Sequence, residues 1–491
     1  MTYSSGGTSV PISLREVEPY VWEIPRGEVA GMNVPVKVYA SRLLLDKMKG
    51  DRTLQQATNV SRLPKVYKHS IVLPDGHEGY GFPIGGVASF DAEEGIVSPG
   101  GVGYDINCGV RLLTTNLTVP EVKPKIKSLV NELFSNIPSG LGSRGKLRFS
   151  IRELESVLEE GAQWAIGRGY GWDEDCRHLE EEGKMALADS DKVSQRAKAR
   201  GAPQLGSLGS GNHFLEINVV DKVFDRRVAD AFGVGGEGQV NILIHTGSRG
   251  LGHQVCGDYL KVLARYAHRV GIRLPDRELA YAHMKSREAS DYIAGMASAC
   301  NFAWANRQFI TFWIRECMEK VFKSPAEDLG LNVVYDVAHN IAKFEEHRIN
   351  GSTMRVIVHR KGATRSFPPG RPEIPADYRE VGQPVFIPGT MGTSSWVMAG
   401  VETAMDRSFG SSAHGAGRQL SRKSAVRTYR GDAVLSSLDK RGIVVKSASI
   451  KVVAEEAPKA YKDVDEVAEV SHAVGVAKKV ARLIPLAVVK G

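Results

Sequence analysis

The sequence of 491 residues lacks the marks of several protein classes. Its five cysteines are widely spaced and form no CxxC pair, which argues against a disulfide framework and favours a reducing, cytoplasmic location. No apolar run reaches the roughly 18 residues of a membrane-spanning helix, and the first residues lack the charged and apolar regions of a secretory signal. We therefore expect neither a membrane anchor nor a signal peptide.

Two nucleotide-handling motifs are also missing. No G-x-x-x-x-G-K-[ST] segment occurs, so the chain is not a P-loop NTPase. No Lys-x-Asp-Gly segment occurs either, and that segment carries the lysine nucleophile of ordinary nucleotidyl-transferring ligases. A nucleotide that becomes covalently attached to this chain must therefore use a different nucleophile.

The composition is that of a folded, basic protein. Hydrophobic residues make up 42% and charged residues 24%, which excludes a disordered or fibrous chain. The 52 glycines gather in clusters, as expected where backbone approaches a ligand closely. Lys and Arg number 64 against 56 Asp and Glu, and the net charge of +8 fits a polyanionic partner such as nucleic acid. Residues 1–12, rich in Ser, Gly and Thr, are predicted to be a flexible extension, whereas residues 13–491 contain no obvious linker.

Hydrophobic periodicity predicts helices and short strands that do not alternate regularly. We expect helices over residues 122–134, 151–166, 181–200, 253–270 and 289–322. We expect strands over residues 70–73, 109–115, 240–244, 331–335, 354–359 and 385–387. This order favours an α+β fold over a doubly wound parallel sheet.

The segment PGGVGYDINCG, residues 99–109, places two metal-binding residue types in one glycine-rich turn. Asp105 and Cys108 lie three residues apart, so the turn can aim both side chains at one point. A carboxylate and a thiolate together form half of a divalent-metal site. The alternative is a buried structural cysteine beside a turn-forming aspartate.

The segment GSLGSGNHFLE, residues 206–216, is a Gly/Ser loop that runs into Asn212, His213 and Glu216. Its backbone N–H groups could hold a phosphate, the histidine a metal, and the other two side chains a nucleotide. The alternative is a polar turn at the start of a hairpin, in which the histidine has only structural hydrogen bonds.

Two further histidines follow apolar strands. His245 ends the run ILIH and precedes Ser248 and Arg249, which suit an oxyanion or phosphate. His339 follows another β-branched run, in YDVAHN. For His339 a position at the edge of the core is an equal alternative, and we expect His253 to begin the next helix rather than bind a metal.

Small residues surround His414 in the segment SSAHGAGR, residues 411–418, so a bulky partner can reach its ring. This setting suits a nucleophile or general base better than a core histidine. The preceding segment IPGTMGTSSW, residues 387–396, is a loop dense in hydroxyls and free N–H groups. Most of the other histidines are predicted to lie at the surface or behind the site, and residues 180–182 on a solvated face.

Taken together, these segments closely resemble the RtcB family of RNA ligases, from about residue 13 to the end of the chain. The extension at residues 1–12 is the main departure, and the Lys490-Gly491 ending also fits. The resemblance implies one compact catalytic domain of RtcB type over residues 13–491, with mixed and antiparallel sheets surrounded by helices. The matching stretches are PDGHEGYGFPIGGV at 74–87, GGVGYDINCGVR at 100–111, GSGNHFLE at 209–216, HTGSRGLGHQ at 245–254, HRKGATRSFPPG at 359–370 and SSAHGAGR at 411–418.

The resemblance implies a GTP- and Mn²⁺-dependent enzyme that joins an RNA 3′-phosphate or 2′,3′-cyclic phosphate end to a 5′-hydroxyl end. Such enzymes act in tRNA splicing and RNA repair, and a small activator, archease, assists many of them. His414 is implied to be the nucleophile, forming a guanylyl-histidine that passes GMP to the RNA 3′-phosphate and so gives an RNA–ppG end.

The same resemblance implies two Mn²⁺ ions bridged by the thiolate of Cys108. His213 and His245 would complete the coordination of one ion, and Asp105 and His339 that of the other. The donor types alone favour Zn²⁺, because thiolate is a soft ligand, so Mn²⁺ comes from the family. Paired ions can neutralise phosphate charge and align an in-line displacement.

The resemblance also implies a guanine nucleotide site. Glu216 can accept the guanine N1 and N2 hydrogens, and Tyr461 can stack on the base. Lys490 adds a donor near the end of the chain, where a frayed terminus is the alternative. Arg249 and Arg418 are candidates for RNA or triphosphate contacts. The full nucleotide set is Asn212, His213, Phe214, Leu215, Glu216, His339, Asn340, Pro388, Gly389, Thr390, Met391, Ser395, His414, Gly415, Ala416, Gly417, Tyr461 and Lys490.

Two other functions compete with the ligase. A dimetal phosphodiesterase that opens cyclic phosphates would use the same Asp/Cys/His cluster but would need neither His414 nor a guanine site. A basic RNA-binding scaffold would keep the cluster as a closed structural site. The open, small-residue setting of His414 argues against the scaffold.

Overall fold

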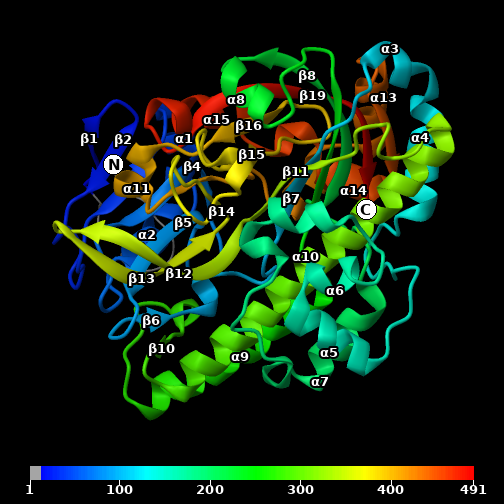
Figure 1. Cartoon of the computed structure of the whole chain (residues 1–491). Helices are drawn as coiled ribbons and strands as arrows, with labels where there is room; N and C mark the ends of the chain where they lie inside the picture. The colour runs from blue at the N-terminus through cyan, green and yellow to red at the C-terminus, as the bar shows by residue number, and fades with distance from the viewer. Residues whose placement is uncertain (1–12) are drawn as a thin grey trace.

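Two large β-sheets form the frame of the molecule (Figure 1). The computed structural model describes residues 13–491, so the flexible extension predicted for residues 1–12 lies outside the described residues. The first sheet has seven strands in the order β1-β2-β3-β4-β5-β13-β12. Its strands are β1 (Arg15–Glu18), β2 (Val21–Ile24), β3 (Val36–Tyr39), β4 (Ser70–His77), β5 (Ile84–Asp91), β12 (Asn340–Ile349) and β13 (Ser352–Lys361). All its neighbouring pairs are antiparallel except β3 with β4.

The second sheet follows the order β11-β7-β9-β8-β19-β16-β15, and β18 pairs in parallel with β19. Its strands are β7 (Gly109–Leu113), β8 (Phe214–Val223), β9 (Val240–Thr246), β11 (Val333–Ala338), β15 (Pro384–Ile387), β16 (Ser395–Ala399), β18 (Val444–Ser447) and β19 (Lys478–Lys490). Two small pairs complete the strands: β6 (Ile96–Val97) with β10 (Ala282–His283), and β14 (Ala363–Arg365) with β17 (Ser411–Ala413).

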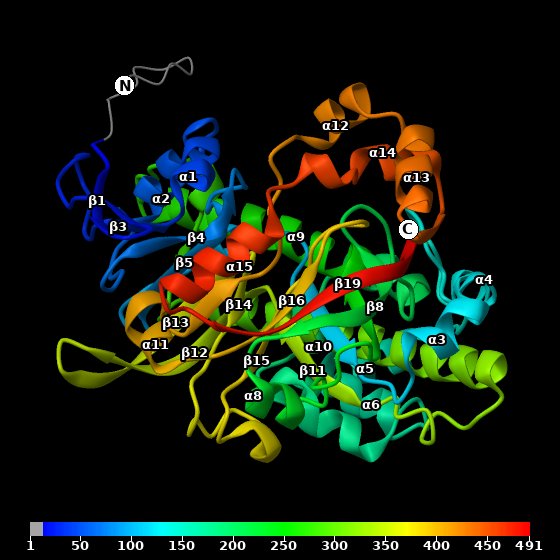
Figure 2. The same cartoon turned by 90° about the horizontal axis from the view of Figure 1, so that it is seen from above.

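Helices surround these sheets (Figures 1 and 2). They are α1 (Arg42–Lys49), α2 (Thr53–Val60), α3 (Val119–Val122), α4 (Ile126–Asn136), α5 (Ile151–Glu160), α6 (Ala162–Ile166), α7 (Gln195–Gly201), α8 (Arg226–Ala231), α9 (Arg249–Arg269), α10 (Arg287–Phe322), α11 (Glu402–Ser408), α12 (Arg422–Thr428), α13 (Gly431–Lys440), α14 (Ile450–Glu455) and α15 (Val464–Ala473). Mixed sheets with surrounding helices confirm the predicted α+β class.

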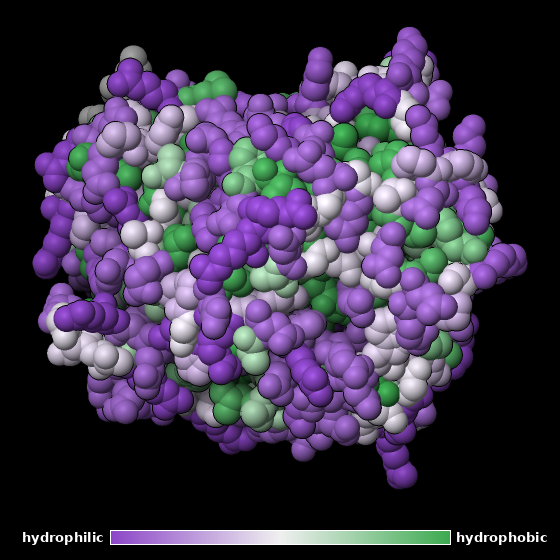
Figure 3. Space-filling view, turned by 45° about the horizontal axis from the view of Figure 1, so that its top comes forward, coloured by the Kyte–Doolittle hydropathy of each residue, from purple (hydrophilic) through white to green (hydrophobic). Residues whose placement is uncertain are grey.

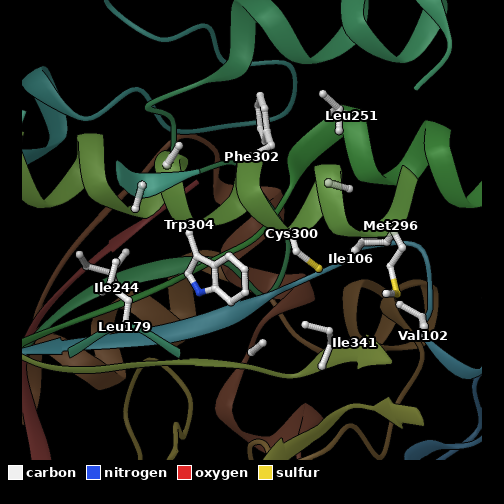
Figure 4. Close-up of a cluster of buried hydrophobic side chains, with 14 of the residues drawn as sticks. Val102, Ile106, Leu179, Ile244, Leu251, Met296, Cys300, Phe302, Trp304 and Ile341 are labelled. Carbon is white, nitrogen blue, oxygen red and sulfur yellow. The ribbon is translucent and has the colours of Figure 1, made fainter. Parts of the chain in front are cut away.

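The longest helix, α10, passes through the largest hydrophobic core. Trp304 and Cys300 project from it toward Ile244 and Ile341 of the strands, while Phe302 projects to the other side (Figure 4). A helix covered on both sides must be apolar around most of its surface, and α10 is buried over most of its length. Outer surfaces are different: on the face in Figure 3 hydrophilic residues predominate and apolar residues form small separate patches.

One predicted helix is wrong. Residues 181–200 contain two short 3₁₀ turns, and only α7 near their end is α-helical. Glu181 and Glu182 have positive φ angles of 56° and 52°, which an α-helix does not contain. Both are exposed, as expected for a solvated face, but Glu180 beside them is fully buried. The Glu181 carboxylate accepts from Lys343 of β12 (2.7 Å) and Arg365 of β14 (2.9 Å), so two distant strands supply the partners that local periodicity does not show.

The predicted helix over residues 151–166 is two helices. Gly161 separates α5 from α6, with a φ of +63°. A Cβ at this position would lie 2.0 Å from the carbonyl oxygen of Gly183, so only glycine fits both the backbone angle and the contact. The helix begins as the sequence chemistry predicts, because Ser150 and Glu153 form a capping box.

The two large sheets are joined where β11 of one passes directly into β12 of the other. His339 is the single residue between these strands, and its N–H donates to the carbonyl oxygen of Cys108 at 2.7 Å. The Asn107 N–H donates in the same way to Asn340 (2.8 Å). This junction holds the turn before β7 against the start of β12 and so positions the site.

Candidate active site

A cavity of about 360 Å³ opens at the junction of the two sheets. Ten separate stretches of the chain supply its wall, from the β4–β5 region to the last strand. Its lining residues are His77, Tyr80, Ile84, Gly103, Tyr104, Asp105, Cys108, Asn212, Phe214, His245, His339, Asn340, Lys361, Gly362, Pro388, Gly389, Thr390, Met391, His414, Gly415, Ala416, Gly417, Arg418, Arg422, Glu456, Tyr461 and Lys490. The motifs that sequence analysis singled out therefore converge on one place.

Five side chains of the types that can ligate a metal gather in and beside this cavity. Donor atoms of Asp105, Cys108 and His213 all lie within 4.8 Å of one another. The Cys108 Sγ is 3.6 Å from His213 Nε2 and 3.3 Å from His245 Nε2. The ring of His339 lies 5.3 Å from that of His245, centroid to centroid. A cluster of one thiol, one carboxyl and three imidazoles is far richer in donors than a structural cysteine beside a turn requires.

Hydrogen bonds at Nδ1 orient two imidazoles of this cluster, those of His213 and His339. His213 Nδ1 is 3.1 Å from the Leu208 carbonyl oxygen, and His339 Nδ1 is 2.9 Å from Thr364 Oγ1. Such bonds fix the ring and leave Nε2 as the ligand atom. Within residues 13–491, the buried Nε2 of His339 has no hydrogen-bond partner. A buried unpaired nitrogen costs free energy unless something binds it, so the donor set fits a metal.

Burial also keeps these groups in the right charge state for metal binding. Burial, together with the charge of neighbouring histidines, holds the pKa of His245 and of His339 well below the ordinary value, so both rings are neutral. Burial raises the pKa of the Cys108 thiol well above its ordinary value. A thiol in this environment becomes a thiolate when a cation binds it, and metal binding there releases a proton.

The Asp105 carboxylate reaches the cluster because glycine leaves room for it. Its Oδ2 lies 2.7 Å from His213 Nε2, and its Oδ1 accepts the Ser248 N–H at 3.1 Å. A Cβ on Gly247 would lie 2.5 Å from that Oδ1. Arg249 begins α9 with a φ of +54°, and its charge acts on Asp105 and Cys108. The HTGSRG motif thus places both a close backbone approach and a partly buried cation beside these side chains.

Behind the cluster, a buried guanidinium joins strands β9 and β11 to the turn before β7. Arg307 of α10 donates to the backbone oxygens of Asn107 (3.0 Å) and Thr246 (2.8 Å), and to the Asp336 carboxylate at 2.8 Å. Asn107 precedes Cys108 in the chain, and Thr246 follows His245. The hydrogen bonds of the Arg307 guanidinium therefore fix the backbone beside both of these side chains.

His414 lies beside the metal donors and is oriented by a carboxylate. Its ring centroid is 5.2 Å from that of His339. Asp75 Oδ2 accepts the His414 Nδ1–H at 2.5 Å and the backbone N–H at 3.0 Å. Burial raises the pKa of Asp75, but the charge and hydrogen bonds of His414 and the charge of Lys462 outweigh it and hold that pKa below its ordinary value. The ionised carboxylate keeps the proton on Nδ1 and leaves the Nε2 lone pair free.

The residues implied to hold guanine lie together at the ends of β8 and β19. Glu216 is fully buried; Ser395 Oγ donates to its Oε2 at 3.4 Å, and its Oε1 has no partner among the described residues. Burial raises the pKa of Glu216 to about 8. Lys490 is 3% exposed within β19, so the frayed-terminus alternative is wrong. Burial lowers the pKa of Lys490 to about 8, although Glu456 and Glu216 oppose the shift.

A buried glutamate that sequence reasoning missed organises the same wall. Glu456 accepts the Tyr461 hydroxyl and an Arg418 N–H at 3.0 Å, and its carboxylate lies 3.8 Å from Lys490 Nζ. Arg418 also donates to Tyr461 Oη (2.8 Å) and to the carbonyl oxygens of Leu420 and Glu455. The N–H groups of Arg418 thus hold the Tyr461 ring in place.

Most of the predicted site residues line the cavity, and some lie behind it. His213, Glu216 and Ser395 are buried directly against lining residues, whereas Leu215 packs into the core from the other face of β8.

Two of the other histidines, His347 and His359, prove to be fully buried in the cores. Further site residues that sequence reasoning missed are His77, Tyr80, Tyr104, Lys361 and Arg422 in the lining, and Asp75 and Lys462 behind it. Asp75 was inside a quoted motif, but no local signal pairs it with a histidine 339 positions later.

Comparison with known proteins agrees with this geometry. A family model described as tRNA-splicing ligase RtcB matches residues 56–491. The tRNA-splicing ligase RtcB of Thermococcus kodakarensis is 59% identical over 480 residues, covering 98% of this chain and 99% of the relative. Those of Pyrobaculum aerophilum (59% over 482 residues) and Aeropyrum pernix (57% over 479 residues) match 98% and 97% of this chain, and 99% of each relative.

These matches place the chain among enzymes of the RNA ligase class. It belongs to the RtcB family of tRNA-splicing ligases. Among the helices of residues 13–491, none combines the length and the apolar character needed to cross a membrane.

Proposed function

We propose that this chain is a GTP-dependent ligase that joins RNA 3′-phosphate or 2′,3′-cyclic phosphate ends to 5′-hydroxyl ends, in tRNA splicing and RNA repair. The observation that carries the proposal is His414, held by Asp75 with Nε2 free and placed beside a metal-donor cluster in one cavity. A phosphodiesterase would need the donors but not this histidine or the buried residues at the ends of β8 and β19.

In the proposed first step, His414 Nε2 attacks the α-phosphorus of GTP. A P–N bond forms, the bond from the α-phosphorus to the bridging oxygen breaks, and pyrophosphate leaves. Asp75 stabilises the positive charge that develops on the ring as the nucleophile attacks. The guanylyl group then passes to the RNA 3′-phosphate, and the 5′-hydroxyl attacks the resulting RNA–ppG end with GMP as the leaving group. Guanylylation thus gives the RNA 3′-phosphate a good leaving group, GMP, in place of a poor one.

We assign two Mn²⁺ ions to the donors Asp105, Cys108, His213, His245 and His339. When bound, the ions supply charge neutralisation for the phosphates that meet there. The protein contributes the preset geometry: Arg307 holds the strand ends, and His339 holds the junction of the sheets.

We assign the guanine to the wall that contains Glu216, Tyr461 and Lys490. The unpaired Glu216 Oε1 is the acceptor available to a base in that wall. Lys490 offers a donor to the same ligand, and Tyr461 offers a ring that Arg418 and Glu456 hold in place. Segments 388–391 and 415–417 line the same cavity, and we assign them to the phosphates and ribose. The cytoplasmic location and an archease-type activator stay predictions.

The test is covalent labelling with GTP carrying a labelled α-phosphate in the presence of Mn²⁺. We expect acid-labile label on the parent protein and none on His414→Ala or Cys108→Ala. The exposed His472→Ala variant, whose histidine lies at the end of α15, is the matched control and keeps the label. Absence of label on the parent, with an activator also supplied, together with opened but unjoined RNA ends, would establish the phosphodiesterase instead.

A further inference from the structure

Three aromatic rings form a row along one wall of the cavity. The rings of Tyr80 and Tyr104 meet edge to face with centroids 5.6 Å apart, and the His253 ring stacks on Tyr104 at 4.7 Å with an interplanar angle of 29°. Both tyrosines line the cavity and are only partly buried, and His253 is exposed on α9. The row therefore runs from the cavity to the surface of the molecule.

None of the steps proposed above uses these three rings. Tyr104 immediately precedes Asp105, and both residues line the same cavity as Cys108. Neither phenol oxygen of Tyr80 or Tyr104 has a hydrogen-bond partner within the described part of the chain. Both rings pack against the largest hydrophobic core on one side, and the part of each ring that stays exposed leaves aromatic surface for a ligand.

Basic side chains lie near both ends of the row. Lys361 lines the cavity, and its Nζ donates to the Tyr80 carbonyl oxygen. Arg200 donates to Gln254, the neighbour of His253, at 2.8 Å. An aromatic surface flanked by cations is the arrangement that binds single-stranded nucleic acid, because bases stack on the rings while phosphates meet the positive charge.

We propose that Tyr104, with Tyr80 and His253, forms a stacking subsite for the base of the terminal nucleotide of an RNA end. This inference rests on the proposed function, since it places the end of an RNA strand at the metal donors. Stacking accepts every base, so the subsite would hold the strand without selecting its sequence. It would also lead the strand out of the cavity along α9, where His253 is exposed.

The experiment compares short single-stranded RNAs that differ only in one base. One RNA carries a 3′-phosphate and the other a 5′-hydroxyl, and each is made with a normal or an abasic terminal nucleotide. Binding to the full chain with Mn²⁺ and without GTP is measured by fluorescence anisotropy. For the end that occupies the subsite, loss of the base is expected to weaken binding to the parent by about tenfold.

Variants of Tyr104 test whether this loss of binding affinity depends on the row of aromatic rings. Tyr104→Leu is expected to bind the normal RNA about tenfold more weakly than the parent and to bind normal and abasic RNA alike. Tyr104→Phe keeps the ring and is expected to keep the preference for the normal RNA. Tyr20→Leu, an exposed tyrosine on the turn between β1 and β2, is the matched control. Melting temperatures of all variants check that each is folded.

Two outcomes would overturn the inference. One is an equal affinity of the parent for normal and abasic RNA at both ends, and the other is an undiminished preference for normal RNA in Tyr104→Leu. Guanylylation of the same preparations reports the proposed function independently. If the protein forms guanylyl-histidine but binds normal and abasic RNA equally, the proposed function stands and the stacking subsite is refuted.

Discussion

At the scale of single residues, the arrangement around His414 sets its reactivity. One carboxylate, Asp75, binds both the ring and the backbone N–H of this histidine. Lys462 supports the carboxylate by its charge and donates to the carbonyl oxygen of Gly76. A buried carboxylate that holds the Nδ1 proton is the general way to make an imidazole both oriented and nucleophilic.

We predict that Asp75→Asn slows guanylylation roughly 100-fold while the protein remains folded, because the amide no longer stabilises the charged ring. The measurement is the initial rate of label transfer from GTP to protein. The exposed Asp406→Asn variant on α11 is the control and should label at the parent rate. A parent-like rate for Asp75→Asn would show that the carboxylate has only a structural role.

The buried Glu216 makes stability depend on pH in a definite direction. Burial raises its pKa from 4.5 to about 8, so the folded protein keeps a proton that the unfolded chain loses above pH 4.5. Its contribution to the free energy of unfolding is therefore full below pH 4.5 and falls as pH rises toward 8.

We predict that Glu216→Gln removes this pH dependence. Relative to the parent, the variant should gain stability between pH 5 and pH 8, by up to about 1.4 kcal/mol per pH unit. Denaturant unfolding at several pH values measures this difference. Lys490, whose pKa is lowered to about 8, affects only the range above pH 8 and does not interfere. A constant difference between the two proteins across this range would contradict the prediction.

At the scale of elements, the strands and the long helices follow the sequence pattern, and the exceptions have tertiary causes. β7, β9 and β15 overlap the expected runs, as do α9 and α10. The segment 181–200 looks like a polar helix but does not form one, because Lys343 and Arg365 bind Glu181 in a strained turn. Periodicity reports which face of a helix is apolar; it does not report a distant cation.

The break between α5 and α6 leads to a prediction at this scale. Gly161→Ala should destabilise the protein by several kcal/mol, because it combines a positive φ with a Cβ 2.0 Å from the Gly183 oxygen. Gly169→Ala is the matched control, since Gly169 has a φ of +85° but no atom within 4 Å of a Cβ. The control should lose only about 1 kcal/mol, the strain of the backbone angle. Denaturant midpoints of the two variants decide the question, and equal losses would refute the steric part of the argument.

At the scale of the whole molecule, the site exists only where the sheets meet. Donors come from the turn before β7, from β8's entrance loop, from β9 and from the β11–β12 junction, and α10 braces them through Arg307. No single element contains a complete site. Binding of ions there should stabilise the entire fold, because the unfolded chain does not hold the donors together.

We predict that Mn²⁺ at about 100 times its dissociation constant stabilises the folded state by about 2.7 kcal/mol and raises the melting temperature. Cys108→Ser should lose most of this rise. Cys317→Ala, which removes a buried thiol of α10 that does not belong to the donor cluster, should keep the rise even if its starting stability is lower. Thermal unfolding with and without the ion, after chelation, measures both. A rise of equal size in Cys108→Ser would place the ion elsewhere.

The sequence by itself determined the chemistry that is available: the donor types, their order along the chain, a histidine among small residues and the α+β pattern. These properties are local, since a motif or a hydrophobic period spans only a few residues. The tertiary structure decided which groups meet. Asp75 reaches His414, Glu456 holds Tyr461, and Tyr104 stacks on His253 only because separate elements pack together. Burial then sets the charges of Glu216 and Lys490, and burial is a property of the folded whole.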